Sequence, residues 1–167
     1  MKSADFWIRE LGLIPLPEEG GLYKEIYRSD EKISASALPE RFRGNRTFST
    51  SIYYLLKHPD FSAFHKINQD EIWHFYYGTS LTIHIIDNNG KYIKRKLGSE
   101  LEKGEELQIV ICKGWLFAAE PEIDSYSLIG CTVAPGFEIE DFMLPSKEEL
   151  LSNYPEYEDL IIRFARK

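Results

Sequence analysis

The feature that most constrains the fold is a series of short strand-like segments between residues 22 and 133, with turns but no helical patterns between them. About nine such segments follow one another at spacings near 8 to 12 residues, which is typical of an all-β sandwich or barrel. Asn88-Asn89-Gly90, for example, is a hairpin-turn sequence between two of them. The expected strands cover residues 22–27, 47–57, 61–67, 72–77, 81–86, 92–97, 107–112, 115–119 and 126–133.

Helical patterns are confined to the two ends of the chain. Ser3 can cap a first helix that Gly12 ends, and Ser146-Lys147-Glu148-Glu149 is a capping box before a second. Tyr154-Pro155 interrupts this pattern, which then resumes. The sequence therefore predicts one domain, residues 1–167. Its parts are an N-terminal helix and loop at 1–21, a β-barrel at 22–133, and a rim segment with terminal helices at 134–167.

Charge and hydropathy narrow the classes of partner and location. A chain of 167 residues is long enough for one stable domain, and its net charge of −7 argues against nucleic acid as a partner. The N-terminus is charged where a signal peptide is apolar, and no apolar run reaches membrane-spanning length. We therefore predict a cytoplasmic protein with no membrane partner, and a homodimer, since sheet edges need covering.

The segment 62–78, S-A-F-H-K-I-N-Q-D-E-I-W-H-F-Y-Y-G, is the strongest indication of a functional site. If a turn at residues 68–70 keeps the register, strand alternation places five side chains on a common face: His65, Ile67, Glu71, Trp73 and Phe75. A buried histidine and carboxylate are costly unless they have partners or a task. The segment therefore predicts a pocket.

The spacing of His65, Glu71 and Gly78 resembles the first motif of the cupin superfamily, and residues 104–117 resemble a worn second motif. More specifically, the chain resembles the Cupin-5 or DUF985 group of largely uncharacterised proteins over nearly its whole length. The resembling segments are L-G-L-I-P-L-P-E-E-G-G-L-Y-K-E-I-Y-R-S, S-I-Y-Y-L-L, H-K-I-N-Q-D-E-I-W-H-F-Y-Y-G and C-T-V-A-P-G-F-E-I-E-D-F. This resemblance implies a double-stranded β-helix, or jelly-roll, barrel.

The chain departs from the metal-binding cupin pattern, which has two further histidines. Ile67 and Phe117 stand at those positions, and neither side chain can bind a metal ion. A metal, if present, would have His65 and Glu71 as ligands. His84 or Gln108 could supply a third ligand, but the spacing of these residues does not support either one. We therefore predict no cofactor. The family is also expected to have a histidine before a Pro-Glu-Gly-Gly segment, where this chain has Leu16 and an additional Glu19.

Metal-free acid–base chemistry is the function that the residues favour. The cupin superfamily, which the chain resembles, includes sugar-nucleotide epimerases that use a histidine base and a tyrosine acid. Here His65 is the candidate base, and Glu71 is available to hold its tautomer. The candidate proton donors are Tyr53, Tyr76 and Tyr126. The expected interior strands lack the basic residues that hold a nucleotide diphosphate, so a sugar nucleotide is an awkward substrate.

The remaining candidates would line a pocket for a small carbohydrate-like or cyclic ligand. These residues are Trp73, Phe75, Gln108, Trp115, Phe117 and Phe137, the last in a rim or lid segment that also contains Phe142. Three alternatives stay open beside the isomerase or epimerase. They are a non-catalytic ligand sensor, a mononuclear metal enzyme of the dioxygenase kind, and a structural His65–Glu71 pair that only joins two strands.

Overall fold

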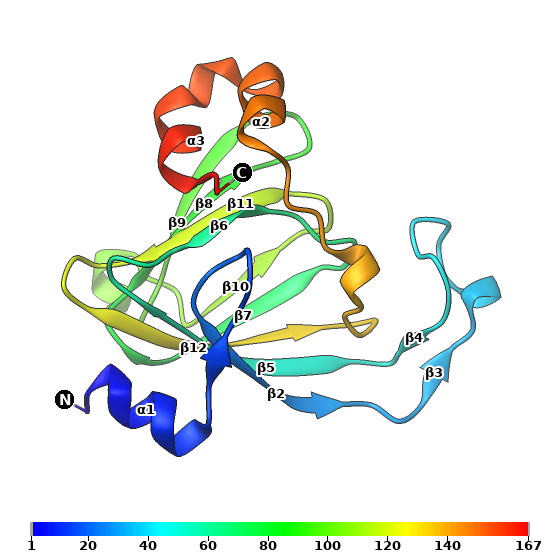
Figure 1. Ribbon diagram of the computed structural model, residues 1–167, viewed down its shortest axis with the longest axis horizontal. Coiled ribbons are helices and arrows are strands. Elements are labelled where there is room, and N and C mark those ends of the chain that lie inside the picture. The colour runs from blue at the N-terminus through cyan, green and yellow to red at the C-terminus, as the bar shows by residue number, and fades with distance from the viewer. Residues whose placement is uncertain (1, 167) are drawn as a thin grey trace.

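Alternating side chains in the central strands build two antiparallel sheets that face each other across an apolar interior (Figure 1). The computed structural model describes residues 2–166. The larger sheet has the order β1 (Ile14–Pro15), β2 (Leu22–Arg28), β5 (Thr50–Lys57), β12 (Tyr126–Val133), β7 (Glu71–Gly78), β10 (Gln108–Ile111). The smaller sheet has the order β6 (Ser62–His65), β11 (Leu116–Pro121), β8 (Leu81–Ile86), β9 (Tyr92–Leu97). A separate pair, β3 (Lys32–Ile33) and β4 (Arg46–Thr47), forms an arm beside the larger sheet.

The predicted all-β jelly-roll class is confirmed. Three of the predicted strands, 81–86, 92–97 and 126–133, have the bounds of β8, β9 and β12. The predicted strand 47–57 is divided, because β4 pairs with β3 in the arm while β5 pairs with β2 and β12 in the larger sheet. The predicted strand 61–67 is shorter in the structure, where β6 ends at His65.

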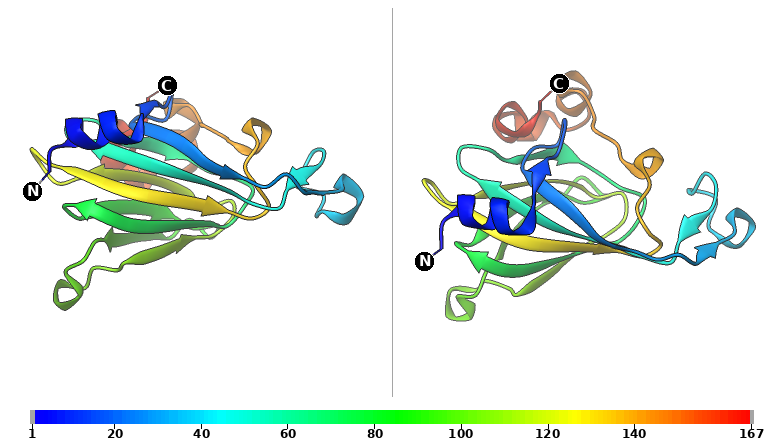
Figure 2. Two further views of the ribbon diagram at one scale, coloured as in Figure 1. Left: turned by 90° about the horizontal axis from the view of Figure 1, so that it is seen from below. Right: turned by 60° about the horizontal axis from the view of Figure 1, so that its bottom comes forward.

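Helices cover the outer faces of the two sheets, as the turned views show (Figure 2). They are α1 (Ala4–Leu11), α2 (Lys147–Asn153) and α3 (Glu158–Phe164), with 3-10 turns η1 (Ala35–Ala37), η2 (Leu101–Lys103), η3 (Ile139–Asp141) and η4 (Pro155–Tyr157). The predicted Ser3 cap and Ser146–Glu149 capping box are both present. Leu150 and Phe164 pack on the smaller sheet, while α1 packs on the larger one. Among the described residues, no helix has the length and apolar character to span a membrane.

The connection between β6 and β7 decides where the site lies. It carries the chain from the smaller sheet to the larger one, so His65 and Glu71 come from opposite sheets and face each other across the interior. The side chains of Leu81, Ile83 and Ile109 fill the other part of this interior and are fully buried. One end is therefore packed solid, and the end with His65 and Glu71 is left open.

Candidate functional site

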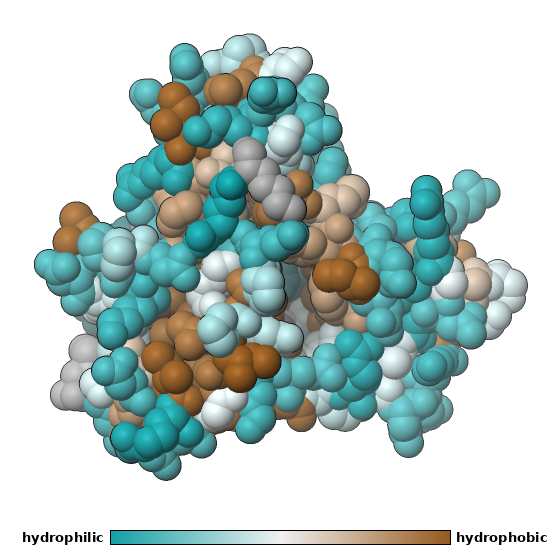
Figure 3. All heavy atoms as spheres, in the orientation of Figure 1, coloured by the Kyte–Doolittle hydropathy of each residue, from teal (hydrophilic) through white to brown (hydrophobic). Residues whose placement is uncertain are grey.

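A cavity of about 570 Å³ lies between the two sheets. Figure 3 shows a hollow near the centre of the face that is turned to the viewer. Its walls come from the first loop (16–19), the inner face of the larger sheet, the end of β6 and the rim segment 137–142. The volume falls within the range of small-molecule pockets. Four residues predicted from the sequence line this cavity: His65, Glu71, Trp73 and Phe137.

His65 is buried at the end of β6 with one fixed ring orientation. Its Nδ1 lies 2.7 Å from the carbonyl oxygen of Ala63, which can only accept, so Nδ1 carries a hydrogen and donates it. In the neutral ring, Nε2 therefore keeps its lone pair, and Nε2 lies 3.9 Å from a carboxylate oxygen of Glu19. The sequence predicts that Glu71 holds the tautomer of His65. That assignment is wrong, because the main chain of β6 itself fills this role.

Glu71 lies opposite His65 on β7, and its carboxyl is held in an unusual protonation state. Burial raises the pKa of Glu71 from its ordinary 4.5 to about 7, although the nearby His65 acts in the opposite direction. The negative charge of Glu19 raises this pKa further, while Trp73 and Cys131 lower it by favouring the carboxylate. A carboxyl with a pKa near 7 can both give and take a proton at neutral pH.

Glu19 is a cavity residue that the sequence analysis did not include among the site residues. The hydroxyl of Ser62 donates to its carboxylate at 2.9 Å, and its carbonyl accepts from the Ala63 N–H at 2.8 Å. Gly20 and Gly21 follow it with positive φ values of 109° and 72°, so the loop turns back over the cavity. This Gly-Gly pair was the available signal, but only the fold shows that Ser62 and Glu19 meet.

Trp73 and Tyr54 contribute the aromatic floor of the cavity. Their rings contact edge to face, with centroids 6.0 Å apart. The hydroxyl of Tyr54 donates to the Gly20 carbonyl at 2.9 Å. The indole N–H of Trp73 lies near the Glu71 carboxyl, yet among the described residues no acceptor is placed to complete a hydrogen bond with it. An unpaired buried donor facing a cavity is a place where a ligand oxygen can bind.

The tyrosines predicted as proton donors do not line the cavity, so this prediction is wrong. Tyr53 and Tyr76 pack against each other on the outer face of the larger sheet, with centroids 6.0 Å apart. The hydroxyl of Tyr126 donates to the Lys2 carbonyl and accepts from the indole of Trp7, which places it under α1. Two other tyrosines line the cavity instead: Tyr23 on β2 and Tyr54, the strand neighbour of Tyr53.

The other predicted ligand-binding residues lie outside the cavity wall. Phe117 is fully buried behind His65, with ring centroids 4.1 Å apart. Phe75 and Trp115 pack against the apolar core and are not among the lining residues. Gln108 pairs with His74 in the β10–β7 register and is exposed, so its side chain is on the outer face. These four residues can support or surround the cavity wall, but they do not contact a molecule within it.

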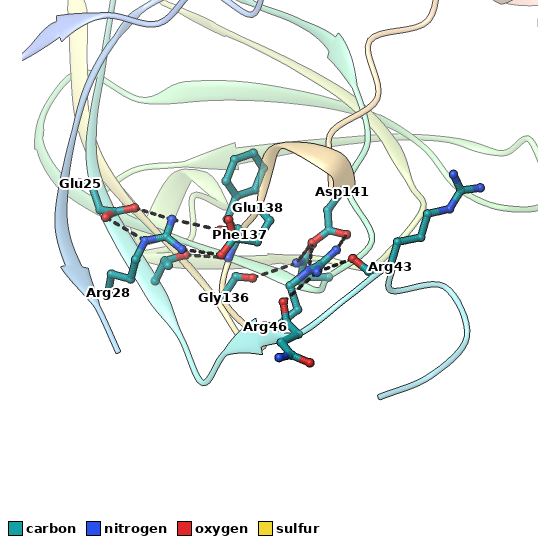
Figure 4. Close-up of polar contacts among 11 residues, drawn as sticks. Glu25, Arg28, Arg43, Arg46, Gly136, Phe137, Glu138 and Asp141 are labelled. Carbon is teal, nitrogen blue, oxygen red and sulfur yellow. Dashed lines mark hydrogen bonds and ion pairs between the residues drawn. The ribbon is translucent and has the colours of Figure 1, made fainter. Parts of the chain in front are cut away.

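Two arginines, Arg28 and Arg46, hold the rim segment, as Figure 4 shows. Arg28 donates to both carboxylate oxygens of Glu25, to the carboxylate of Glu138 and to the Phe137 carbonyl. Arg46 makes a buried bidentate ion pair with Asp141, with both N–O distances 2.8 Å. The rim thereby keeps Phe137 and Phe142 over the cavity, consistent with the predicted rim or lid.

The donor atoms at the site do not fit a cupin metal centre. The ring of Phe117 and the side chain of Ile67 occupy the positions where further histidines would be needed. His84 is on the outer face of the smaller sheet, where it contacts Tyr92, Glu120 and Phe164, so it cannot join His65. Among the described residues, no group of three or more His, Cys, Asp or Glu side chains is arranged to hold a metal ion.

Two facing antiparallel sheets around a ligand-sized cavity, with a histidine and a glutamate from successive strands in its wall, define a cupin-type barrel. Residues 5–145 match the family described as Cupin superfamily (DUF985), and the chain belongs to this family.

Two solved structures are similar to this chain in sequence and fold, and a third relative is similar in sequence. Protein SO0799 from Shewanella oneidensis is 37% identical, with a TM-score of 0.89 and 99% of both chains covered. A hypothetical protein from Leishmania major is 31% identical, with the same TM-score and 99% and 100% coverage. The uncharacterized protein YML079W of Saccharomyces cerevisiae is 33% identical over 145 residues, which is 79% of this chain and 71% of the yeast protein.

A more distant likeness supports the fold alone. Oxalate decarboxylase from Bacillus subtilis is 15% identical with a TM-score of 0.56, and the match covers 94% of this chain and 38% of that one. These similarities identify the family and its barrel without identifying a reaction.

Proposed function

We propose that this protein binds a small carbohydrate-like or cyclic molecule in the cavity and transfers a proton on it, as an isomerase or epimerase does. The observation that carries the proposal is the orientation of His65. Its Nδ1–H is held by the Ala63 carbonyl, so the basic Nε2 is left in the cavity wall beside Glu19. A neutral imidazole held in this tautomer can take a proton through Nε2.

The proton donor in the proposed reaction is Glu71, because the tyrosines predicted for this role do not line the cavity. His65 Nε2 would take a proton from a carbon next to a ligand carbonyl, and the C–H electron pair would pass to that carbonyl as an enolate. With a pKa of about 7, Glu71 is close to half protonated at pH 7 and can return a proton from the facing sheet. The unpaired N–H of Trp73 is available to the enolate oxygen. One proton is taken and one is given, and exchange with water resets both groups.

Ligand capture in D₂O tests this proposal. The protein is incubated with a total polar-metabolite extract in D₂O, and the captured small molecules are released and analysed by mass spectrometry. We expect a captured compound that carries one carbon-bound deuterium. Capture should be retained and deuterium incorporation lost in His65→Gln, because glutamine can fill the space without acting as the base.

The matched control is His74→Gln, since His74 lies on the outer face of the larger sheet, outside the cavity, and stacks with Tyr76. This variant should capture and exchange like the wild-type protein. Capture without deuterium would contradict proton transfer and leave the non-catalytic sensor. No captured compound would contradict ligand binding altogether.

A further inference from the structure

The charges in the cavity wall restrict the class of ligand, and this inference rests on the proposed function. We infer that the ligand is an uncharged or cationic hydroxylated molecule and that the cavity rejects anions such as phosphates and carboxylates.

Carboxylates dominate the charged groups of the cavity wall. The five glutamates that line it come from the first loop, β2, β7 and the rim: Glu18, Glu19, Glu25, Glu71 and Glu138. Among the lining residues that the structure describes, one is a lysine or an arginine, and it is Arg28. Even with Glu71 protonated and Glu18 left out of the balance, Glu19, Glu25 and Glu138 outnumber Arg28 in the wall. An anion that enters would lose its hydration and meet like charges at short range.

Arg28 is not free to offset this excess. Its guanidinium already donates to both oxygens of Glu25 at 3.1 and 2.9 Å, to Glu138 at 2.8 Å and to the Phe137 carbonyl at 3.1 Å. These contacts raise the pKa of Arg28, with the hydrogen bonds to Glu25 as the largest cause, so the group stays charged and paired. An anionic ligand would have to displace two carboxylates to reach it. In Figure 4 both carboxylates lie against the guanidinium at the edge of the rim.

The inner end of the cavity favours a ligand that both donates and accepts hydrogen bonds. Glu19 and the Nε2 atom of His65 offer acceptors 3.9 Å apart, which suits a hydroxyl or an ammonium group. The Trp73 N–H lies near Glu71 without a hydrogen bond of full geometry, so it can donate to a ligand hydroxyl or carbonyl oxygen. Trp73 is 1% exposed, so this donor is deeply placed. A hydroxylated ring satisfies these groups together, and its faces can pack against Phe137 and Phe142.

Fluorescence quenching of Trp73 tests the charge selectivity without knowledge of the ligand. The contribution of Trp73 is the difference between the wild-type protein and Trp73→Phe. The probes are acrylamide, caesium and iodide, which are neutral, cationic and anionic, at matched ionic strength. We expect acrylamide and caesium to quench Trp73 about ten-fold more effectively than iodide, because a one-signed cleft concentrates or depletes small ions by such factors.

A double variant, Glu25→Gln with Glu138→Gln, supplies the matched comparison. It frees Arg28 at the mouth and should raise quenching of Trp73 by iodide several-fold while acrylamide quenching stays constant. Equal quenching by iodide and caesium in the wild-type protein would overturn this inference and leave the ligand-binding proposal intact. Absence of quenching by all three probes would show no charge selectivity at Trp73 and would also overturn this inference.

A fractionated extract then tests the ligand class directly. The polar-metabolite extract is divided by anion exchange, and each fraction is offered to the protein. We expect capture from the unbound, neutral and cationic fraction, with loss of capture in Glu19→Gln. Capture from the anionic fraction alone would overturn the inference while supporting ligand binding.

Discussion

Replacement of Glu71 by glutamine should change the pH dependence of stability, with the sign set by the raised pKa. Below pH 4.5 the carboxyl is protonated in the folded and unfolded states alike, so it contributes no pH dependence. Between pH 4.5 and about 7 the unfolded chain loses this proton while the folded protein keeps it. The free energy of unfolding therefore falls as the pH rises through this range, and the fall is complete above it.

The size of this effect follows from the two pKa values. A change from 4.5 to about 7 corresponds to about 3 kcal/mol, because each pKa unit is worth about 1.4 kcal/mol. Glutamine is uncharged at every pH and is close in shape to the protonated acid. The stability of Glu71→Gln relative to the wild-type protein should therefore increase by about 3 kcal/mol between pH 4.5 and pH 8.

Urea unfolding followed by circular dichroism at several pH values measures this difference. Exposed Glu40 is the control position, and Glu40→Gln accounts for the loss of one surface carboxylate far from the cavity. A stability difference between Glu71→Gln and the wild-type protein that stays constant from pH 4.5 to 8 would refute the assignment of a buried carboxyl with a pKa near 7. It would also contradict the proposed role of Glu71 as the proton donor.

Further predictions concern the supports of the cavity. Asp141→Ala should cost about 3–5 kcal/mol in urea unfolding, because it leaves the buried Arg46 guanidinium unpaired; a loss below 1 kcal/mol would contradict this. Gly20→Ala should cost about 1–3 kcal/mol and weaken ligand capture, since a Cβ at this positive φ collides with the Phe61 carbonyl; unchanged capture would contradict the loop's role. Ser146→Ala should cost about 1 kcal/mol by loss of the capping box, measured by thermal unfolding. The homodimer stays a prediction, and sedimentation equilibrium that gives a monomer would contradict it.

Strand parity predicted part of the site and failed where both faces of a strand are covered. On β7 strand parity placed Glu71 and Trp73 on one inward face, and both line the cavity. On β5 the run Tyr53-Tyr54-Leu55-Leu56 has no such alternation, because α1 covers the outer face and that face is also apolar. The sequence therefore could not distinguish Tyr53 from Tyr54 as the inward tyrosine.

Glu19 could not be placed because its position depends on contacts far along the chain. The carboxylate is fixed by Ser62, the loop main chain by Ala63, and the glycine turn by Asp60, which accepts from the Gly21 N–H at 2.7 Å. Arg166 adds hydrogen bonds to the Glu19 carbonyl and to Asp60 from beyond the last helix. None of these partners is a neighbour in sequence, so a local pattern identified the loop but not its role.

Ile67 and Phe117 stand where the metal-binding cupin pattern has histidines, and both add apolar surface near the His65–Glu71 site. Ile67 lines the cavity beside Glu71, and the ring of Phe117 packs 4.1 Å from the His65 ring. A histidine at either position would bring polar N–H groups or positive charge that favour the carboxylate, whereas apolar side chains exclude them. Burial is accordingly the largest cause of the raised Glu71 pKa. Apolar residues at these two positions therefore fit both a site with too few metal ligands and a carboxyl whose charged form is disfavoured by burial.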